Sequence, residues 1–417
     1  MEFKDILKRF VKKENYFYRL RTNELLVYYL GIKMFKVKDN MVIPNLAVFL
    51  PNSKNNPQNL KANDFGQVIE DFNTINYTVK FKSGNSEEDI IDYEKVFDKA
   101  KDSSENRENM SFNGKNLSEF DIETLEKLEN ILSRRIRLYS KSLIKGEYDE
   151  LLPDFKCTTK NEDGKREKVY QLKLMNYLNE SEKREKIIKA NQKLNKKLID
   201  KNTYPLEMEY NFINNTKKRQ GITFPDGRID NVLIRKNVVN FVEIKIGTAV
   251  IAKKNGIHKH LIDMLYAKIN NVIVPNEIDE IVKERNKILS ECGIKKQFGT
   301  NTINEMEYNI VCGYKDENEM NAVKALLDKI YKMSFANELL LTKSDLINNN
   351  GKQSKSKKLL KYINKIKLKY GELNNKNLVD YSIEEYINEL NKMGCRTTIF
   401  LANDDYSNIK EYSNEQN

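Results

Sequence analysis

Two acidic residues and one lysine, Asp230, Glu243 and Lys245, lie in a stretch whose pattern is typical of a β-hairpin. Residues 229–235 and 238–246 are rich in apolar and β-branched side chains, and the two residues between them fit a tight turn. A two-residue turn sets the pairing register, and this register places Asp230 directly opposite Glu243. Lys245 shares their face because side chains alternate along a strand. The hairpin therefore brings two carboxylates and one amine together.

Two carboxylates in these positions repel each other unless something neutralises them. Cross-strand partners have Cβ atoms about 4.5–5.5 Å apart, where like charges destabilise the sheet. Their neighbours on this face are apolar: Val232, Ile234, Val239 and Phe241. Two close and partly desolvated anions need a cation or a shared proton, and hard oxygen ligands suit Mg²⁺ or Mn²⁺. An adjacent lysine then orients or activates a water molecule and stabilises charge that builds up on phosphorus.

The alternative is an ordinary solvated sheet face that carries a salt bridge. The other face of the hairpin argues against it, because that face is also apolar: Ile229, Leu233, Val242, Ile244 and Ile246. A strand that is buried on both sides rarely carries three charges without a function. We therefore favour an active site.

The motif resembles the signature of the PD-(D/E)XK nuclease superfamily, which has the restriction-endonuclease-like fold. It consists of Gly-Arg-Ile-Asp ending at Asp230, twelve intervening residues, and Glu243-Ile244-Lys245. The resemblance implies that Asp230, Glu243 and the backbone carbonyl of Ile244 bind Mg²⁺, with Mn²⁺ as a substitute, and that Lys245 assists catalysis. The literal Pro-Asp pair ends at Asp226, but that residue precedes the strand in a Pro-Asp-Gly turn sequence, so we prefer Asp230.

The predicted fold class is α/β (α+β), with a restriction-endonuclease-like core whose central mixed sheet is flanked by helices. The order of predicted elements matches that family core: a helix at 169–201, strands at 206–213, 229–235 and 238–246, a helix at 257–270, a strand at 308–315 and a helix at 318–333. We expect five segments: an N-terminal mixed domain (1–100), a linker (101–117), a helical connector (118–168), the nuclease core (169–335) and a basic helical C-terminal extension (336–417).

Several further residues are candidates for metal or substrate contacts. In some members of the family a helix before the first strand adds a carboxylate, and Glu182 and Glu185 are the candidates here. Glu207 and Glu209, which share one strand face, are weaker ones, and the sequence does not decide among these four. Nucleic-acid contacts are assigned to residues of the helix after the hairpin and of the most basic segment, with solvated charge as the alternative: Lys259, His260, Lys358, Lys361 and Lys365.

Composition restricts the classes of protein that this chain can belong to. Of the 417 residues, 39% are hydrophobic and 32% are charged, and no apolar run has the length of a membrane span. The net charge of +11 suits a polyanionic partner, although heavy use of Lys, Asn and Ile throughout weakens that argument. Four scattered cysteines indicate reduced thiols in a cytoplasm, and two histidines exclude His-rich zinc chemistry.

From these observations we expect a Mg²⁺-dependent deoxyribonuclease, an endonuclease of the restriction or genome-defence type. It would act in the cytoplasm on DNA, with RNA as the alternative substrate, and as a homodimer if both strands are cut. Two other hypotheses stay open. One is a non-catalytic nucleic-acid-binding or assembly protein whose hairpin carboxylates are structural, and the other is an RNase on the same core.

Overall fold

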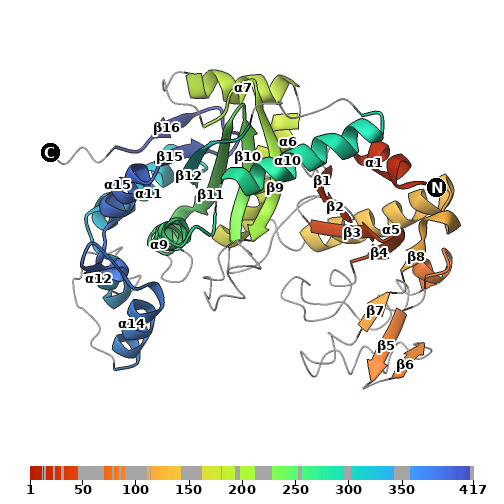
Figure 1. The fold of residues 1–417 in the computed structure, drawn as a ribbon, viewed down its shortest axis with the longest axis horizontal. Helices are drawn as coiled ribbons and strands as arrows, with labels where there is room; N and C mark the ends of the chain where they lie inside the picture. Colours follow the sequence, from red (N-terminus) through yellow and green to blue (C-terminus); the bar gives the residue numbers. More distant parts are fainter. Residues whose placement is uncertain are drawn as a thin grey trace. The chain divides into compact units, whose positions relative to one another are not determined.

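The structure is a computed structural model of the chain (Figure 1). It describes residues 1–11, 13, 16–21, 24–29, 32–45, 70–77, 79–83, 86–89, 110–112, 114–141, 162–179, 181–192, 198–211, 228–251, 256–273, 275–294, 302–341 and 357–413. The chain divides into two compact units. Unit 1 comprises Met1–Lys165 and Lys287–Lys295, and unit 2 comprises Arg166–Asn286 and Lys296–Asn417.

Unit 1 is built on antiparallel sheets. A five-stranded sheet has the order β1 (Tyr16–Arg21), β2 (Glu24–Tyr29), β3 (Ile32–Lys38), β4 (Met41–Pro44) and β8 (Lys115–Asn116), and a smaller sheet has the order β6 (Ser86–Asp89), β5 (Val79–Ser83) and β7 (Met110–Phe112). Its helical elements include α1 (Phe3–Val11), the 3₁₀ turn η2 (Leu117–Glu119) and α5 (Ile122–Lys141). Several aromatic residues of β1 and β2 are buried, so they form core: Phe17, Tyr18 and Tyr29.

Helix α5 follows the apolar spacing that predicts it. Leu125, Leu128, Leu132 and Ile136 are all buried on one face, as three- and four-residue spacing requires. The helix begins at Ile122, where the side chain of Asp121 accepts a hydrogen bond from the backbone N–H of Thr124.

Unit 2 contains a six-stranded mixed sheet that carries the hairpin. Its order is β16 (Ile409–Glu411), β15 (Cys395–Asn403), β12 (Glu305–Tyr314), β11 (Val238–Ile246), β10 (Arg228–Arg235) and β9 (Thr203–Asn211). Neighbours β11–β12 and β12–β15 are parallel, whereas the other three pairs are antiparallel. This confirms the predicted α/β class with a central mixed sheet flanked by helices.

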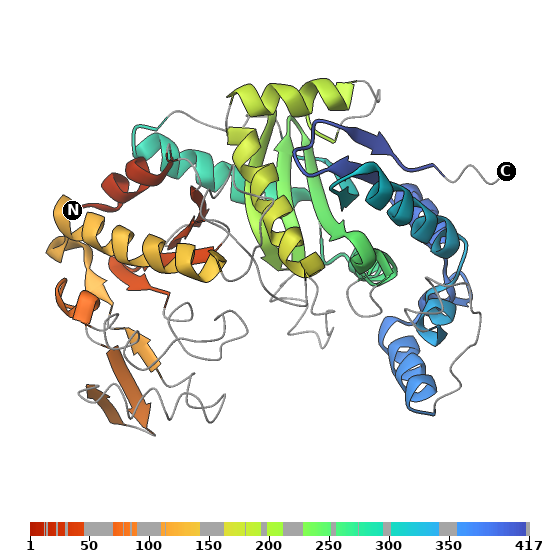
Figure 2. The same cartoon turned by 180° about the vertical axis from the view of Figure 1, so that it is seen from behind.

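Unit 2 also contains helical elements, several of which flank this sheet. They are α6 (Glu162–Asn179), α7 (Ser181–Gln192), η3 (Gly247–Ile251), α9 (Ile257–Ile269), α10 (Pro275–Glu291), α11 (Glu317–Tyr331), α12 (Phe335–Leu340), α14 (Lys357–Tyr370), η4 (Leu378–Asp380) and α15 (Ile383–Lys392), with a short pair of strands, β13 (Glu372–Leu373) and β14 (Lys376–Asn377). Helix α6 begins and helix α10 ends within unit 1. Figures 1 and 2 show α9 on one face of the large sheet and α6 on the other. Among the described residues, no helix combines the length and apolar composition that crossing a membrane requires.

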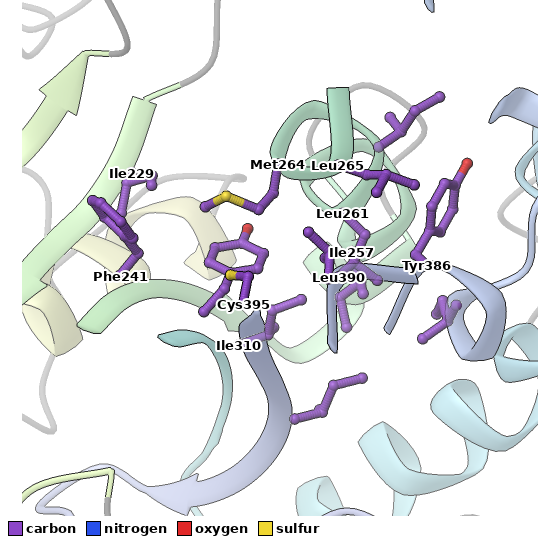
Figure 3. Packing of buried hydrophobic residues seen from close by; sticks show 14 of the residues in the cluster. Ile229, Phe241, Ile257, Leu261, Met264, Leu265, Ile310, Tyr386, Leu390 and Cys395 are labelled. Carbon is purple, nitrogen blue, oxygen red and sulfur yellow. The ribbon is translucent and has the colours of Figure 1, made fainter. Parts of the chain in front are cut away.

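Helix α9 is held on the sheet by a hydrophobic core. Figure 3 shows side chains of α9 packing between the sheet and α15: Ile257, Leu261, Met264 and Leu265 from α9, Phe241 and Ile310 from the sheet, and Tyr386 and Leu390 from α15. Burying a side chain of this size stabilises the fold by about 1.5–3 kcal/mol. The core therefore fixes the position of α9 against β11.

Three boundaries differ from those predicted. The single helix expected at 169–201 is two helices, because the first begins at Glu162 and ends at Asn179 before α7 begins at Ser181. The expected linker at 101–117 contains β7 and β8, and residues 101–109 lie outside the described part of the chain. Unit 1 also extends beyond the N-terminal domain expected at 1–100, because it takes in α5.

The C-terminal segment is part of the core and not an extension from it. The strand β15 pairs in parallel with β12 along its whole length, from Met306↔Cys395 to Tyr314↔Asn403. Side chains of β15 such as Ile399 and Leu401 are buried in the same cluster as α9. An exposed edge of β12 would leave a row of unpaired backbone groups, and β15 covers it. The strands β15 and β16 therefore complete the sheet that carries the hairpin.

Candidate active site

The predicted register of the hairpin is confirmed up to its last backbone pair. Strands β10 and β11 pair from Arg235↔Val238 to Asn231↔Val242, on either side of a turn in which Lys236 has a φ of 54°. At the next residue of β10, Asp230, a side chain takes the place of a backbone acceptor. Its Oδ2 atom accepts a hydrogen bond from the backbone N–H of Ile244 at 2.7 Å. This contact holds the Asp230 carboxylate beside the backbone of the Glu-Ile-Lys segment.

Glu243 is the most deeply buried acid of the site, with 1% of its surface exposed. Its Oε1 atom accepts a hydrogen bond from Lys245 Nζ at 2.7 Å and lies 3.2 Å from His260 Nε2. Its Oε2 atom is buried and has no hydrogen-bond partner among the described residues. Burial raises the pKa of the Glu243 carboxyl well above its usual range, and the negative charge of Asp230 raises it further.

Lys245 is buried among three acids. In addition to Glu243, the Glu167 carboxylate lies 3.6 Å from its Nζ atom. Burial lowers the pKa of Lys245, but the carboxylates of Glu243, Asp230 and Glu167 outweigh that effect and raise it above its usual value. One ammonium group thus neutralises part of the acidic cluster.

Helix α6 supplies two further residues of the site, which the sequence analysis did not identify. The side chain of Gln171 donates a hydrogen bond to Asp230 Oδ1 at 2.5 Å, and Glu167 reaches Lys245. These two residues are four apart, so they share one face of the helix. The sequence does contain a glutamate and a glutamine at helical spacing, which could have indicated these two residues. The predicted helix begins at residue 169, however, and therefore excludes Glu167.

Close packing against β12 holds α6 in place. A Cβ atom at Gly313 would lie 2.5 Å from the ring of Tyr170, so only glycine allows this helix to approach the strand. The hydroxyl of Tyr170 also donates a hydrogen bond to the carbonyl of Tyr314 at 2.7 Å. Because Gln171 is the next residue of α6, these contacts fix its distance from Asp230.

The four additional acids are placed differently from one another. Glu182 and Glu185 are exposed on α7, and the structure does not bring them to the hairpin. Glu207 is buried on β9 opposite Val232. Glu209 falls between the pairs Ile229↔Tyr210 and Asn231↔Met208, which gives it the register position opposite Asp230. The side chain of Glu209 lies outside the described part of the structure.

The residues predicted to contact nucleic acid also fall into different groups. His260 lies at Glu243, inside the carboxylate cluster, whereas Lys259 forms an ion pair with Asp263 on the same helix. Lys361 and Lys365 are exposed on α14, and the side chain of Lys358, on the same helix, is outside the described residues. The structure therefore assigns His260 to the site itself and leaves Lys361 and Lys365 available to solvent.

The donor set fits a cation that keeps water or substrate oxygens in its coordination shell. No group of three His, Cys, Asp or Glu residues that could hold a metal ion occurs among the described residues. Mg²⁺, however, is usually held by one or two carboxylates together with waters and phosphate oxygens. Asp230 and Glu243 supply two such carboxylates, and the Oε2 atom of Glu243 supplies an oxygen that no group in the described part of the chain satisfies.

Comparisons with protein-family models, with curated proteins and with solved structures found no match to this chain. The argument for function therefore depends on the residues and geometry of the site.

Proposed function

We propose that unit 2 is a Mg²⁺-dependent nuclease that hydrolyses phosphodiester bonds in DNA. The observation that carries this proposal is the cluster of Asp230, Glu243 and Lys245 on adjacent strands, with one buried carboxylate oxygen that has no partner among the residues that the structure describes. A purely structural cluster would satisfy that oxygen, because a buried acceptor without a hydrogen bond costs about 1–3 kcal/mol. A site that receives a cation during function has a reason to retain it.

Each residue has a distinct role in this proposal. Asp230 and Glu243 would hold Mg²⁺ or Mn²⁺, with the carbonyl of Ile244 as a further oxygen. The bound ion supplies Lewis-acid chemistry at the scissile phosphate. Lys245 assists deprotonation of the attacking water or neutralises negative charge that develops on phosphorus. Gln171 and Glu167 position Asp230 and Lys245, respectively.

Three further considerations support DNA as the substrate and genome defence as the biological setting. The net charge of +11 and the exposed lysines of α14 suit a polyanion. The motif and the element order of unit 2 resemble PD-(D/E)XK nucleases, to which restriction enzymes belong. Double-strand cleavage then requires two active sites, so we propose a homodimer that acts in the cytoplasm.

The test is a cleavage assay with supercoiled plasmid, single-stranded DNA and RNA in Mg²⁺, Mn²⁺ or EDTA. We expect cleavage of DNA that EDTA abolishes and that Asp230→Asn and Lys245→Met each reduce by about 10²–10³-fold. Asp279→Asn is the matched control, because Asp279 is also a buried carboxylate but accepts hydrogen bonds from the Ile303 N–H and from Lys283, which are not residues of the Asp230–Glu243 cluster. It should leave the cleavage rate unchanged.

Three outcomes would contradict parts of the proposal. Metal-dependent cleavage that persists in both site variants would exclude these residues as the catalytic site. Cleavage of RNA alone would change the substrate to RNA. Binding of DNA without cleavage in any metal would favour a non-catalytic nucleic-acid-binding protein.

A further inference from the structure

Helix α14 lies in a stretch of the chain that carries charge of one sign. Between Asp345 and Glu372 there are eight lysines and no acidic residue, and six of these lysines belong to α14. Like charges at four-residue spacing on a helix repel each other and destabilise it. The lysines of α14 therefore oppose one another in the free protein, and an anionic partner would relieve that repulsion.

Three of these lysines, Lys361, Lys365 and Lys369, are exposed and form what we call the lysine row. Their four-residue spacing places them on one side of the helix, and the row is about 12 Å long because the helix rises about 1.5 Å per residue. Within the part of the chain that the structure describes, none of the three forms an ion pair. Lys369 Nζ lies 5.8 Å from the centroid of the Tyr370 ring, a contact that leaves its positive charge unbalanced.

The acids of the elements next to α14 are mostly engaged with other groups. Asp380 of η4 pairs with Lys367, which is not part of the row, at 2.8 Å. Glu338 of α12 is buried and contacts His258. Glu372, which follows the helix on β13, is exposed. Even when Glu372 is counted against the three lysines, the row keeps an excess of two positive charges.

The inner side of α14 is attached to α9, the helix that carries His260. The hydroxyl of Tyr370 donates a hydrogen bond to the buried carboxylate of Asp263 on α9. Lys259 of the same helix pairs with that carboxylate, so Asp263 is balanced within α9. Ile363 of α14 is buried in the hydrophobic core of unit 2. Because His260 lies at Glu243, these contacts give α14 a fixed position relative to the carboxylate site.

We propose that the lysine row is a docking surface for the phosphate backbone of DNA, separate from the carboxylate site. Ammonium groups on one side of a helix can each contact a phosphate, and such contacts position the duplex without reading its sequence. The surface would hold the substrate while the carboxylate site cleaves it. This inference rests on the proposed function only for the choice of DNA as the polyanion.

An anionic membrane is the other polyanionic surface that a basic helix can bind. Helices that lie in a membrane interface insert their apolar face into the lipid. The apolar face of α14 is already packed against protein, since Ile363, Ile366 and Tyr370 are buried. Among its described side chains, Leu360 and Leu368 are the exposed apolar ones. Two leucines give little apolar area for insertion, so the observations favour the DNA backbone.

The test measures binding of the full chain to a labelled DNA duplex by fluorescence anisotropy in EDTA, over a range of salt concentrations. The logarithm of the binding constant falls linearly with the logarithm of the salt concentration, with a slope of about −0.9 per phosphate contact. One variant combines Lys361→Gln, Lys365→Gln and Lys369→Gln, because glutamine and lysine have similar helix propensities. Its slope should be smaller in magnitude by about 2–3, and its binding at least about tenfold weaker at about 100 mM salt.

Two further variants separate local charge from net charge. The matched control combines Lys127→Gln, Lys283→Gln and Lys392→Gln, which removes three exposed lysines that each pair with a carboxylate. It has the same net charge as the row variant, and it should bind DNA as the wild type does. Arginine at all three positions of the row keeps the charge and should also preserve wild-type binding. Circular dichroism checks that every variant is folded.

Several outcomes would overturn the docking surface. Equal losses in the row variant and the matched control would show that net charge alone accounts for binding. The proposal also fails if the row variant binds DNA with the slope of the wild type, or if it loses binding to phosphatidylserine vesicles while its binding to DNA is unchanged. Because the assay contains no metal, these results are independent of cleavage. A row variant that cleaves and binds DNA normally would remove the docking surface and leave the nuclease in place.

Discussion

Each of the two units buries a glutamate beside basic side chains, and the two glutamates differ in how completely their carboxylate oxygens are hydrogen-bonded. In unit 1, Glu129 is 6% exposed. Its Oε1 atom accepts hydrogen bonds from Lys13 and from the hydroxyl of Tyr16, and its Oε2 atom accepts one from Arg9 Nε at 3.0 Å. Both oxygens therefore have protein donors.

Glu243 in unit 2 is more deeply buried and less well satisfied. Lys245 and His260 both approach Oε1, and Oε2 has no hydrogen-bond partner among the described residues. Burial raises the pKa of both glutamates, but the donors around Glu129 outweigh that effect and lower its pKa, whereas the pKa of Glu243 stays raised. The comparison indicates that the Glu129 cluster stabilises the fold, while the Glu243 cluster retains capacity for a ligand.

The largest expected difference between the two glutamates is in catalysis. Glu243→Gln keeps the shape of the side chain but removes a charged ligand from the proposed metal site, so cleavage should fall by about 10²–10³-fold. Glu129→Gln should leave the cleavage rate of the folded protein unchanged. The assay uses plasmid in Mg²⁺ at a temperature where circular dichroism shows both variants folded. Equal losses in the two variants would contradict the distinction.

The second prediction concerns stabilisation by the metal ion itself. A ligand that binds only the folded state stabilises it by about 2.7 kcal/mol at one hundred times its dissociation constant. Mg²⁺ should therefore raise the unfolding temperature of the wild type and of Glu129→Gln, but not of Asp230→Asn. Differential scanning calorimetry with Mg²⁺ or with EDTA measures this without reference to activity. A Mg²⁺ effect that survives in Asp230→Asn would place the ion elsewhere.

The hairpin could be predicted from the sequence because its information is local. A two-residue turn and alternating side chains are sufficient to set the register that brings Asp230 to Glu243. Gln171 and Glu167 could not be identified in this way. The apolar periodicity of a helix gives the face that is buried, but not which residues of that face reach the end of a neighbouring strand.

The pairing partner of the C-terminal strand also could not be predicted from local sequence patterns. Residues 397–402 have the composition of a strand, and the structure contains one there, β15. Its partner, however, is β12, almost ninety residues earlier, through parallel pairing of Ile310 with Ile399. Parallel strands are joined by long crossovers, so no turn motif between them indicates the pairing. The sequence therefore predicts an extension at 336–417, although β15 belongs to the core.

The third prediction concerns the free energy of unfolding, for which we expect Glu129→Gln to have a larger effect than Glu243→Gln. Glu129→Gln loses ionic hydrogen bonds to Arg9 and Lys13 in a partly buried setting, so the free energy of unfolding should fall by about 1.5–3 kcal/mol. Glu243→Gln removes a charge that burial and Asp230 disfavour, so its effect should be smaller or stabilising. Urea denaturation of both variants in EDTA compares them. A larger loss for Glu243→Gln would show that its cluster also stabilises the fold.

The smallest expected effect is the contribution of Glu129 to the pH dependence of the free energy of unfolding. The pKa of Glu129 is lowered in the folded protein because the hydrogen bonds from Lys13, Tyr16 and Arg9 outweigh the effect of burial. A glutamate in the unfolded chain has a pKa of about 4.3. The unfolded state therefore binds more protons than the folded state in this window. Stability from Glu129 should be complete above about pH 5 and should decline as the pH falls through the lowered pKa. Urea midpoints measured in this acidic range should fall more steeply for the wild type than for Glu129→Gln, and parallel curves would remove Glu129 as a source of acid sensitivity.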